Sequence, residues 1–270
     1  MSRDSEGLVF PRLKGSVNVL EDSMRKKTIG VVALAFLVVV VAFCATEPAR
    51  VQAQRAPDPM MSPLDRYLIP DENSEVALAR SAAPPSISDQ AEVMVLGRDG
   101  YTTASKGGNG FVCLVQRSWA AATDFPEFWN AKILAPICLN PAAARTLVPL
   151  ILMKTKLAVA AKSRAEIAEA VKSAMDNGTV PALQPGAMCY MMSKQQYLSN
   201  HDMNWHPHLM WFVPGDAAKA WGANLLGSPV LAANDPEDRM TIFLVWVRHW
   251  SDGTPAPQDK SATLAPHTMH

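Results

Sequence analysis

The sequence predicts an α+β fold: a largely antiparallel sheet in a single domain, with a helical hairpin inserted between its strands. Three observations predict it. Short apolar runs separated by turn residues occupy about residues 92–117, helical spacing follows over 141–176, and further strand-like runs lie between 187 and 250. Strands that come before and after a block of helices are typical of α+β domains rather than of alternating βαβ units.

The first strands are short and joined by turns. The apolar run 93–96 ends at a turn over 97–100, and 101–104 is a brief polar strand. A Gly-rich turn at 106–110 leads into a clear strand over 111–117. This turn has neither GxGxxG nor P-loop spacing, so a three-stranded meander is favoured over a phosphate-binding loop.

A loop with aromatic anchors is expected over 118–140, and helices follow it. Asn140 is expected to cap a helix that has Pro141 at its first position. Pro149 should interrupt this helix, because proline lacks the N–H that continues the hydrogen-bond ladder. A second helix is therefore expected from about Leu150 to Ala161.

The next helix has signals at both ends. Ser163 and Glu166 have the spacing of a capping box, and Gly178 supplies a left-handed C-terminal cap. Later strands are expected at 187–192, 208–213 and 240–250, with a short helix from Asp216 to Trp221 and a loop to Arg239. The last strand is apolar on both faces, which predicts a central position covered on both sides.

The N-terminal region has the parts of a secretory signal. The basic triplet 25–27 precedes an uncharged apolar run over 29–45, and small residues lie just before Gln54. Cleavage before Gln54, which would remove residues 1–53, is the favoured interpretation. The chain is then expected to be extracytoplasmic, either periplasmic or secreted.

An alternative keeps the same run as a membrane anchor. Residues 1–23 are long for the basic part of a signal peptide, so the true start is either Met1 or Met24. Seventeen residues at 1.5 Å each span about 26 Å, slightly less than the ~30 Å core of a bilayer. Any membrane contact is expected only through residues 29–45.

The chain is expected to divide into four parts. Residues 54–90 are rich in Pro, Ser and Ala without an apolar period, so a Pro-rich tether or an irregular strap is expected there. Residues 91–250 are expected to form the globular domain, and 251–270 a C-terminal tail.

Composition excludes one class of partner. The 270 residues contain 25 Lys and Arg against 25 Asp and Glu, and 49% of them are hydrophobic. The chain is therefore globular, and it lacks the basic surplus that nucleic-acid binding requires. No nucleic acid is expected as a partner.

Several short motifs resemble a known family. They are Asn109-Gly110-Phe111-Val112-Cys113-Leu114-Val115, Pro136-x-Cys138, Arg145-Thr146, Pro185-Gly186, Tyr190-Met191 and Pro207-His208-Leu209-Met210. Over about residues 92–250 the chain resembles a family of secreted bacterial proteins that has no assigned function. The resemblance implies a single extracytoplasmic domain, and it brings no catalytic residue with it.

One cluster of residues could bind a metal. The candidate ligands are His201, Asp202, His206 and His208, and imidazole with carboxylate suits Zn or a similar transition metal. His206 and His208 are two residues apart, so on a strand both would face the same way. The same segment also fits a polar loop that leads into a strand.

Aromatic residues surround this cluster. Trp205 and Trp211 lie beside it in sequence, and Trp246 lies on the last long strand. The three could line a ligand cleft, since such clefts are mostly apolar, or they could be ordinary core and sheet packing.

Three cysteines follow the apolar run: Cys113, Cys138 and Cys189. In an oxidising compartment two of them can pair, and three pairings are open. Cys113–Cys138 is preferred, because it would tie the third strand to the start of the helical region and close the intervening loop.

The sequence favours a non-catalytic extracytoplasmic domain with a binding or interaction role. It contains no G-x-S-x-G, H-E-x-x-H or C-x-x-C motif. The alternative is a metal-dependent enzyme built on the histidine cluster.

Overall fold

The computed structural model describes residues 60–201, 205–228 and 230–257. Four α-helices have the bounds α2 Glu72–Arg80, α3 Pro85–Ser88, α4 Pro141–Val159 and α5 Arg164–Asp176. The strands are β1 Glu92–Gly97, β2 Gly100–Ser105, β3 Val112–Gln116, β4 Ala135–Leu139, β5 Met188–Met191, β6 His208–Pro214, β7 Leu231–Asp235 and β8 Met240–Trp246. Within these ranges no helix is both long and apolar enough to cross a bilayer, and the run 29–45 lies outside them.

The α+β prediction is confirmed. The strands form one sheet in the order β2-β1-β3-β4-β5-β6-β8-β7, and every neighbouring pair is antiparallel except β1 and β3. The helical pair α4–α5 lies between β4 and β5 in the chain, as expected.

The expected meander is wrong, because β3 lies on the far side of β1 and runs parallel to it. To reach this position the chain after β2 crosses close to the start of β1, where the Gly108 N–H donates to the Gln90 carbonyl. A Cβ on Gly107 would lie 2.1 Å from the Glu92 nitrogen. The Gly-rich turn is therefore a place of close backbone approach, which only glycine permits.

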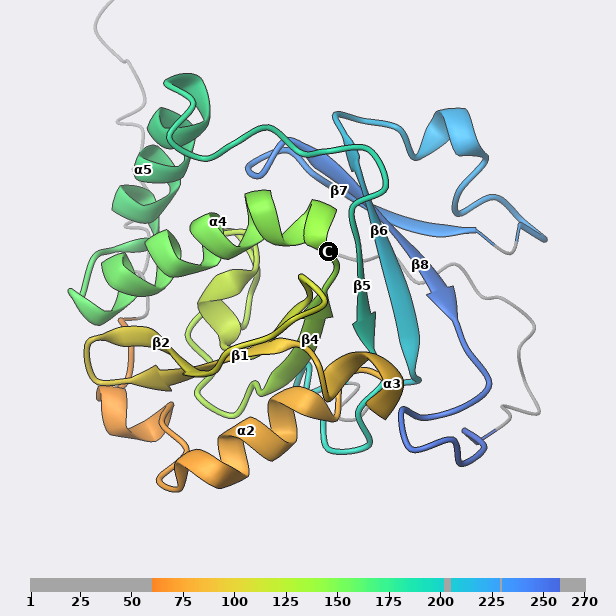
Figure 1. Cartoon of the computed structure of the whole chain (residues 1–270). Helices are drawn as coiled ribbons and strands as arrows, with labels where there is room; N and C mark the ends of the chain where they lie inside the picture. The colour runs from red at the N-terminus through yellow and green to blue at the C-terminus, as the bar shows by residue number, and fades with distance from the viewer. Residues whose placement is uncertain (1–59, 202–204, 229, 258–270) are drawn as a thin grey trace, which may run out of the picture. The chain divides into compact units, whose positions relative to one another are not determined.

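Helices cover the two faces of the sheet's first half. Figure 1 shows α4 above strands β1 and β2, and α2 below them. The larger core lies on the α4 side and includes Leu114, Ile137, Leu139, Leu147 and Ile167. The smaller core lies on the α2 side and includes Leu78, Ala79, Val93, Cys113 and Cys138.

Helix α4 is continuous, so the expected break at Pro149 is wrong. Leu147 before the proline and Leu150 and Ile151 after it are all buried in the larger core. Burial of this apolar face outweighs the one helical hydrogen bond that proline removes. The Asn140 cap is confirmed: its side chain accepts a hydrogen bond from the Ala143 N–H at 2.9 Å.

Helix α5 has the predicted ends. The Ser163 side chain accepts from the Glu166 N–H, and the Glu166 carboxylate accepts from the Ser163 N–H at 2.8 Å. Gly178 has a φ of +75°, the left-handed conformation expected of the residue that ends the helix.

The tether expected over 54–90 is wrong for its described part, residues 60–90. Helix α2 packs on β1, β3 and β4, and Leu78, Ala79, Ala82 and Ala83 are buried there. Small alanines let the chain approach the sheet closely, but they resemble a linker in composition. This segment therefore belongs to the globular domain.

A buried ion pair fixes α2 to the sheet. The Arg117 Nη2 lies 3.0 Å from Glu75 Oε1, and both side chains are almost fully buried. The same Glu75 oxygen accepts from the Leu96 N–H at 3.0 Å, and Arg117 Nε donates to the Tyr67 carbonyl at 2.7 Å. Charges this deep in a protein need such partners.

Several later expectations also differ from the structure. Strand β4 lies within the expected loop 118–140, and β7 within the expected loop before Arg239. The expected short helix is present as a 3₁₀ helix, Lys219–Trp221, but Asp216 does not cap it. Asp216 instead accepts a hydrogen bond from the Asn234 side chain at 2.7 Å. Residues 251–257 of the expected tail fold back on the domain, where the Ser251 N–H donates to the Met192 carbonyl.

The Cys113–Cys138 disulfide is present, which confirms the preferred pairing. The two residues are direct cross-strand partners in β3 and β4. Cys189 is a buried free thiol on β5, and burial raises its pKa. The cross-strand neighbour of Cys189 on β4 is Leu139, not Cys138. Adjacent residues of a strand point to opposite faces, so Cys189 lies on the opposite face of the sheet from the disulfide.

Candidate functional site

Four aromatic rings gather where β6 begins and β8 ends. We call Trp205, His206, His208 and Trp246 the aromatic cluster. His208 is the cross-strand partner of Trp246, and its ring lies 5.0 Å from the Trp205 ring in an edge-on arrangement. The His206 ring stacks on Trp246 with a centroid distance of 5.4 Å. The start of β6 and the end of β8 thus bring these four rings close together.

His208 is the buried member of the cluster, with 1% of its surface exposed. Its Nδ1 lies 2.8 Å from the His206 carbonyl. A carbonyl only accepts, so Nδ1 carries the proton and Nε2 keeps its lone pair. Burial is the main cause that lowers the pKa of His208 to about 4, and the ring is therefore neutral at neutral pH.

The structure places the three described candidate ligands in different environments. His201 lies in an exposed turn, and Asp202 lies outside the described residues. His206 stacks on Trp246, whereas His208 is buried against Trp205. Within 60–201, 205–228 and 230–257, no three His, Cys, Asp or Glu side chains are grouped so that they could hold a metal ion. The complete set of four includes Asp202, so a metal site there stays a proposal.

The three tryptophans do not form one cleft. Trp205 and Trp246 lie 6.3 Å apart in the aromatic cluster. Trp211 is three residues beyond His208 on β6, so it points to the opposite face, where it packs near Phe243.

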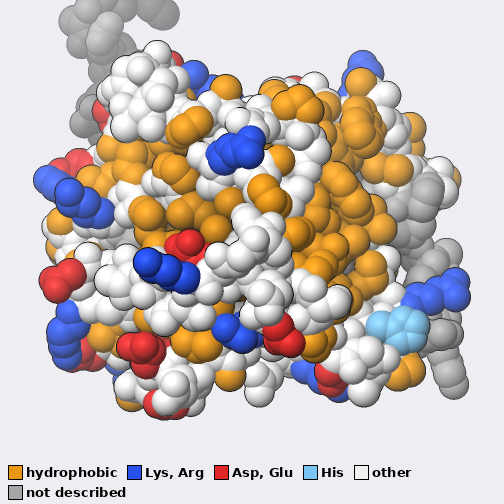
Figure 2. All heavy atoms as spheres, viewed as in Figure 1, with side chains coloured by type: hydrophobic (Ala, Val, Ile, Leu, Met, Phe, Trp, Pro, Cys, Tyr) orange, Lys and Arg blue, Asp and Glu red, His pale blue; other side chains and the backbone are white. Residues whose placement is uncertain are grey.

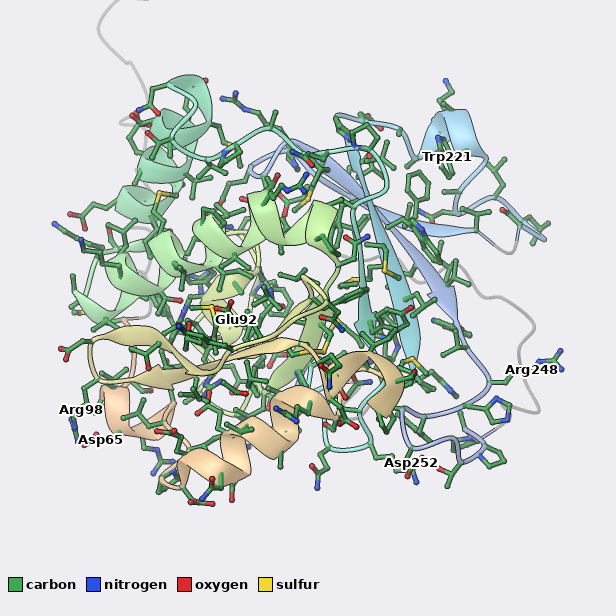
Figure 3. The ribbon with its side chains drawn as sticks, viewed as in Figure 1. Asp65, Glu92, Arg98, Trp221, Arg248 and Asp252 are labelled. Carbon is green, nitrogen blue, oxygen red and sulfur yellow. A yellow bond between two sulfur atoms is a disulfide. The ribbon has the colours of Figure 1, made fainter. Side chains whose placement is uncertain are left out.

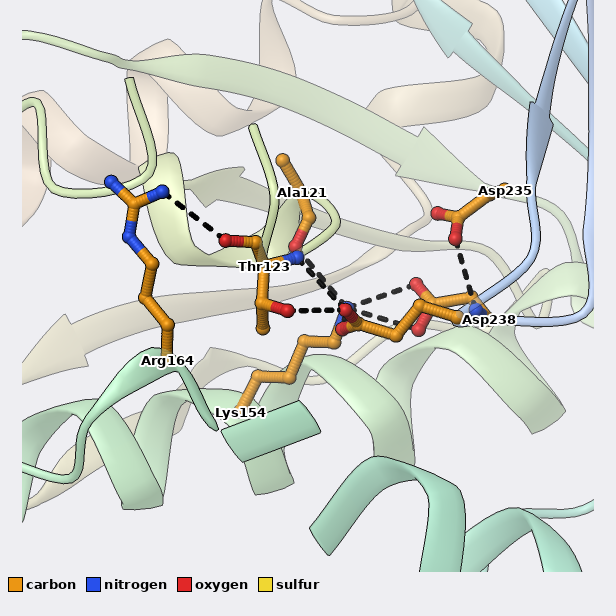
Figure 4. A network of polar contacts seen from close by, with 7 residues as sticks. Ala121, Thr123, Lys154, Arg164, Asp235 and Asp238 are labelled. Atoms are coloured by element: carbon orange, nitrogen blue, oxygen red, sulfur yellow. Dashed lines mark hydrogen bonds and ion pairs between the residues drawn. The ribbon is translucent and has the colours of Figure 1, made fainter. Parts of the chain in front are cut away.

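A buried lysine joins the β7–β8 hairpin to α4 (Figure 4). Lys154 Nζ lies 3.0 Å from Asp238 and 3.3 Å from Glu237, and it donates to the Ala121 carbonyl at 3.2 Å. The two carboxylates raise the pKa of Lys154 despite its burial. Burial, together with the charges of Asp235 and Glu237, raises the pKa of Asp238 to about 7.

The sequence contains a signal for this network. Lys154 lies at helical spacing from Leu147, Leu150 and Ile151, in the middle of the apolar stripe of α4. A lysine in such a stripe needs a buried acidic partner, and the turn between β7 and β8 supplies it. The geometry therefore indicates a structural role for this network, which joins α4 to the turn between β7 and β8.

The second half of the sheet leaves apolar side chains uncovered on its α2 side. We call Met188, Tyr190, Leu209, Trp211 and Val245 the open sheet face. Cross-strand register places Tyr190, Leu209 and Val245 in one row and Met188 and Trp211 in the next. Val245 is 45% exposed, and the other four are half-buried. Figure 2 shows apolar side chains gathered over β5, β6 and β8.

This surface contrasts with the same side of β1, β3 and β4, which α2 covers. The strand β8 was expected to be covered on both faces, and this expectation is wrong at Val245 and Trp246. Contiguous exposed apolar surface of this kind is uncommon on monomeric proteins.

Comparison with protein-family models, curated proteins and solved structures finds no match for this chain.

Proposed function

We propose that this chain is a non-catalytic extracytoplasmic binding domain, and that its open sheet face docks a protein partner. The observation that carries the proposal is the apolar row Tyr190, Leu209 and Val245, which continues the covered α2 side of the sheet without a covering helix. Aromatic and aliphatic side chains on a rigid sheet are suited to the centre of a protein interface.

Two features support the extracytoplasmic location. The Cys113–Cys138 disulfide is typical of proteins from oxidising compartments. The basic and apolar segment 25–45 has the composition of an export signal. The resemblance to secreted bacterial proteins agrees with both. N-terminal sequencing of the exported protein should begin near Gln54, and a chain that keeps residues 25–27 and partitions with membranes would indicate the anchor instead.

Site-specific cross-linking tests the open sheet face. A photo-reactive residue at Leu209 or at Trp211, introduced into the full chain in the producing cell, should give the same discrete adduct with one partner. The matched control is Glu169, an exposed position on α5, which should give none. Adding Val245→Lys to the Leu209 variant should remove the adduct. Absence of an adduct from both face positions in a folded protein would contradict the proposal.

The second candidate is a metal-dependent enzyme that uses His201, Asp202, His206 and His208. One observation favours it: His208 donates through Nδ1 to a backbone carbonyl, which is how proteins orient a histidine that binds a metal through Nε2.

A further inference from the structure

The loop between β6 and β7 exposes large apolar side chains at its tip. Leu226 is 97% exposed, Leu225 is 65% exposed and Trp221 is 57% exposed. In Figure 3 Trp221 lies in this loop, at the far end of the sheet from the Asp65–Arg98 ion pair. Exposed leucines scattered singly are common, but two adjacent leucines beside an exposed tryptophan form a patch.

Hydrogen bonds hold this loop in one conformation, so the exposure of its apolar side chains is a fixed feature of the fold. The Asn224 side chain donates to the Ala232 carbonyl at 2.7 Å and accepts from the Ala232 N–H at 3.0 Å, which ties the loop to β7. The Asn224 backbone takes the left-handed conformation, with a φ of +60°. This fixed bend turns Leu225 and Leu226 outward.

The loop's backbone makes many of its hydrogen bonds internally. The Ala223 N–H donates to Ala218, the Asn224 N–H to Val230 and the Ser228 N–H to Leu225. Backbone groups paired in this way enter an apolar medium at a lower cost than free ones. The Trp221 ring stacks on Phe243 at 4.5 Å, which supports one side of the indole and leaves the other exposed.

The charge of this loop indicates what kind of surface it contacts. The loop contains two charged side chains. Asp216 lies at its start and accepts a hydrogen bond from the Asn234 side chain on β7, whereas Lys219 is exposed beside Trp221 and is the one charge in the tip, residues 217–228. A tip with two leucines, one tryptophan and one lysine, and with no acidic group, matches the interface of a bilayer. Leucine enters the acyl boundary there, tryptophan prefers the headgroup level and lysine approaches anionic headgroups.

We infer that this loop is a membrane-contact site, with Leu225 and Leu226 inserted into a phospholipid surface and Trp221 and Lys219 at headgroup level. This contact is separate from residues 29–45, through which alone the sequence predicted a membrane association. It borders the open sheet face, because Trp221 stacks on Phe243, the cross-strand partner of Trp211. It shares no residue with that face and does not depend on the protein partner proposed for it.

Depth-dependent quenching tests the inference, because it reports on Trp221 even when another part of the chain also holds the membrane. The full chain is mixed with vesicles of phosphatidylethanolamine and phosphatidylglycerol whose acyl chains are brominated. Tryptophan emission of the parent should be quenched more than that of Trp221→Phe. The double variant Leu225→Ser, Leu226→Ser should abolish this difference, and Lys219→Ala should make it less sensitive to removal of phosphatidylglycerol.

Val245→Ser is the matched control. It removes an exposed apolar side chain of similar size from the open sheet face, and it should leave the quenching of Trp221 unchanged. If the parent and Trp221→Phe are quenched equally, or if the double serine variant keeps the difference, the loop does not enter the bilayer and the inference is wrong. Because all substituted side chains are exposed, unchanged thermal unfolding should accompany each variant.

Discussion

Cys113 and Cys138 face each other across β3 and β4, and their disulfide lies between the sheet and α2. The bond joins residues 25 apart in the chain, so it restricts the unfolded state appreciably. We expect Cys138→Ala to lower the free energy of unfolding by about 3 kcal/mol and to abolish the sensitivity to reductant. Urea denaturation with and without dithiothreitol measures both.

Cys189→Ala is the control for the disulfide. This thiol is buried on the other face of the sheet, so the variant should keep the parent's response to reductant. A non-reducing peptide map that contains Cys189 in a disulfide would contradict the assignment.

Lys154→Met should strongly destabilise the protein. It removes the cation but leaves Asp238 and Glu237 facing a buried site, and breaking a buried pair on one side costs about 3–5 kcal/mol. Lys172→Met provides the comparison, because its ion pair with Asp176 is exposed and solvent screens such pairs, so its loss should change stability little. Similar losses in the two variants, measured by urea denaturation, would show that the buried network is not stabilising.

His208 should make stability depend on pH. Its pKa in the folded state is about 4 and its ordinary value is 6.5, so the unfolded state takes up the proton first as pH falls. The stability it contributes is fully present above pH 6.5 and is lost as pH falls towards 4, by up to about 3 kcal/mol.

The test of His208 needs a difference measurement, because Asp238 acts in the opposite direction. The raised pKa of Asp238 means that its folded carboxyl holds a proton more tightly than the unfolded one, so its contribution is lost as pH rises from 3.8 to about 7. Subtracting the unfolding free energies of His208→Gln from those of the parent cancels this second effect. A difference that stays constant between pH 7 and pH 4 would refute the prediction for His208.

Removal of residues before Glu92 should prevent folding. That truncation takes away α2 and Glu75, which uncovers the smaller core and leaves Arg117 buried without its carboxylate. A chain that begins at Met60 keeps these contacts and is the matched control. Far-UV circular dichroism and the dispersion of amide proton signals distinguish the two. A native spectrum from the shorter chain would restore the tether hypothesis for residues 60–90.

Metal content decides between the two candidate functions. A non-catalytic domain should contain no stoichiometric transition metal after purification without an affinity tag, and it should take up none when Zn is added. His249→Ala, which removes an exposed histidine outside the candidate set, is the control. Stoichiometric metal that is lost in His206→Ala and His208→Ala, but kept in His249→Ala, would favour the metal-dependent enzyme instead.

Local signals in the sequence were sufficient for a large part of the fold. The Asn140 cap, the Ser163–Glu166 capping box and the Gly178 end depend on residues within one turn of each other, so neighbouring residues determine them. Short apolar runs within 111–117 and 240–250 indicated strands for the same reason. The disulfide pairing followed from a preference for joining the third strand to the helical region.

Tertiary structure decided the rest, because those features depend on contacts between distant residues. The parallel pairing of β3 with β1, the continuity of α4 through Pro149 and the folding of residues 60–90 all depend on burial against the sheet, which local propensity does not report. The candidate sites also depended partly on sequence and partly on tertiary structure. Sequence spacing identified His206 and His208, but only strand register placed Trp211 on the opposite face from Trp246, because a side chain's face depends on its pairing.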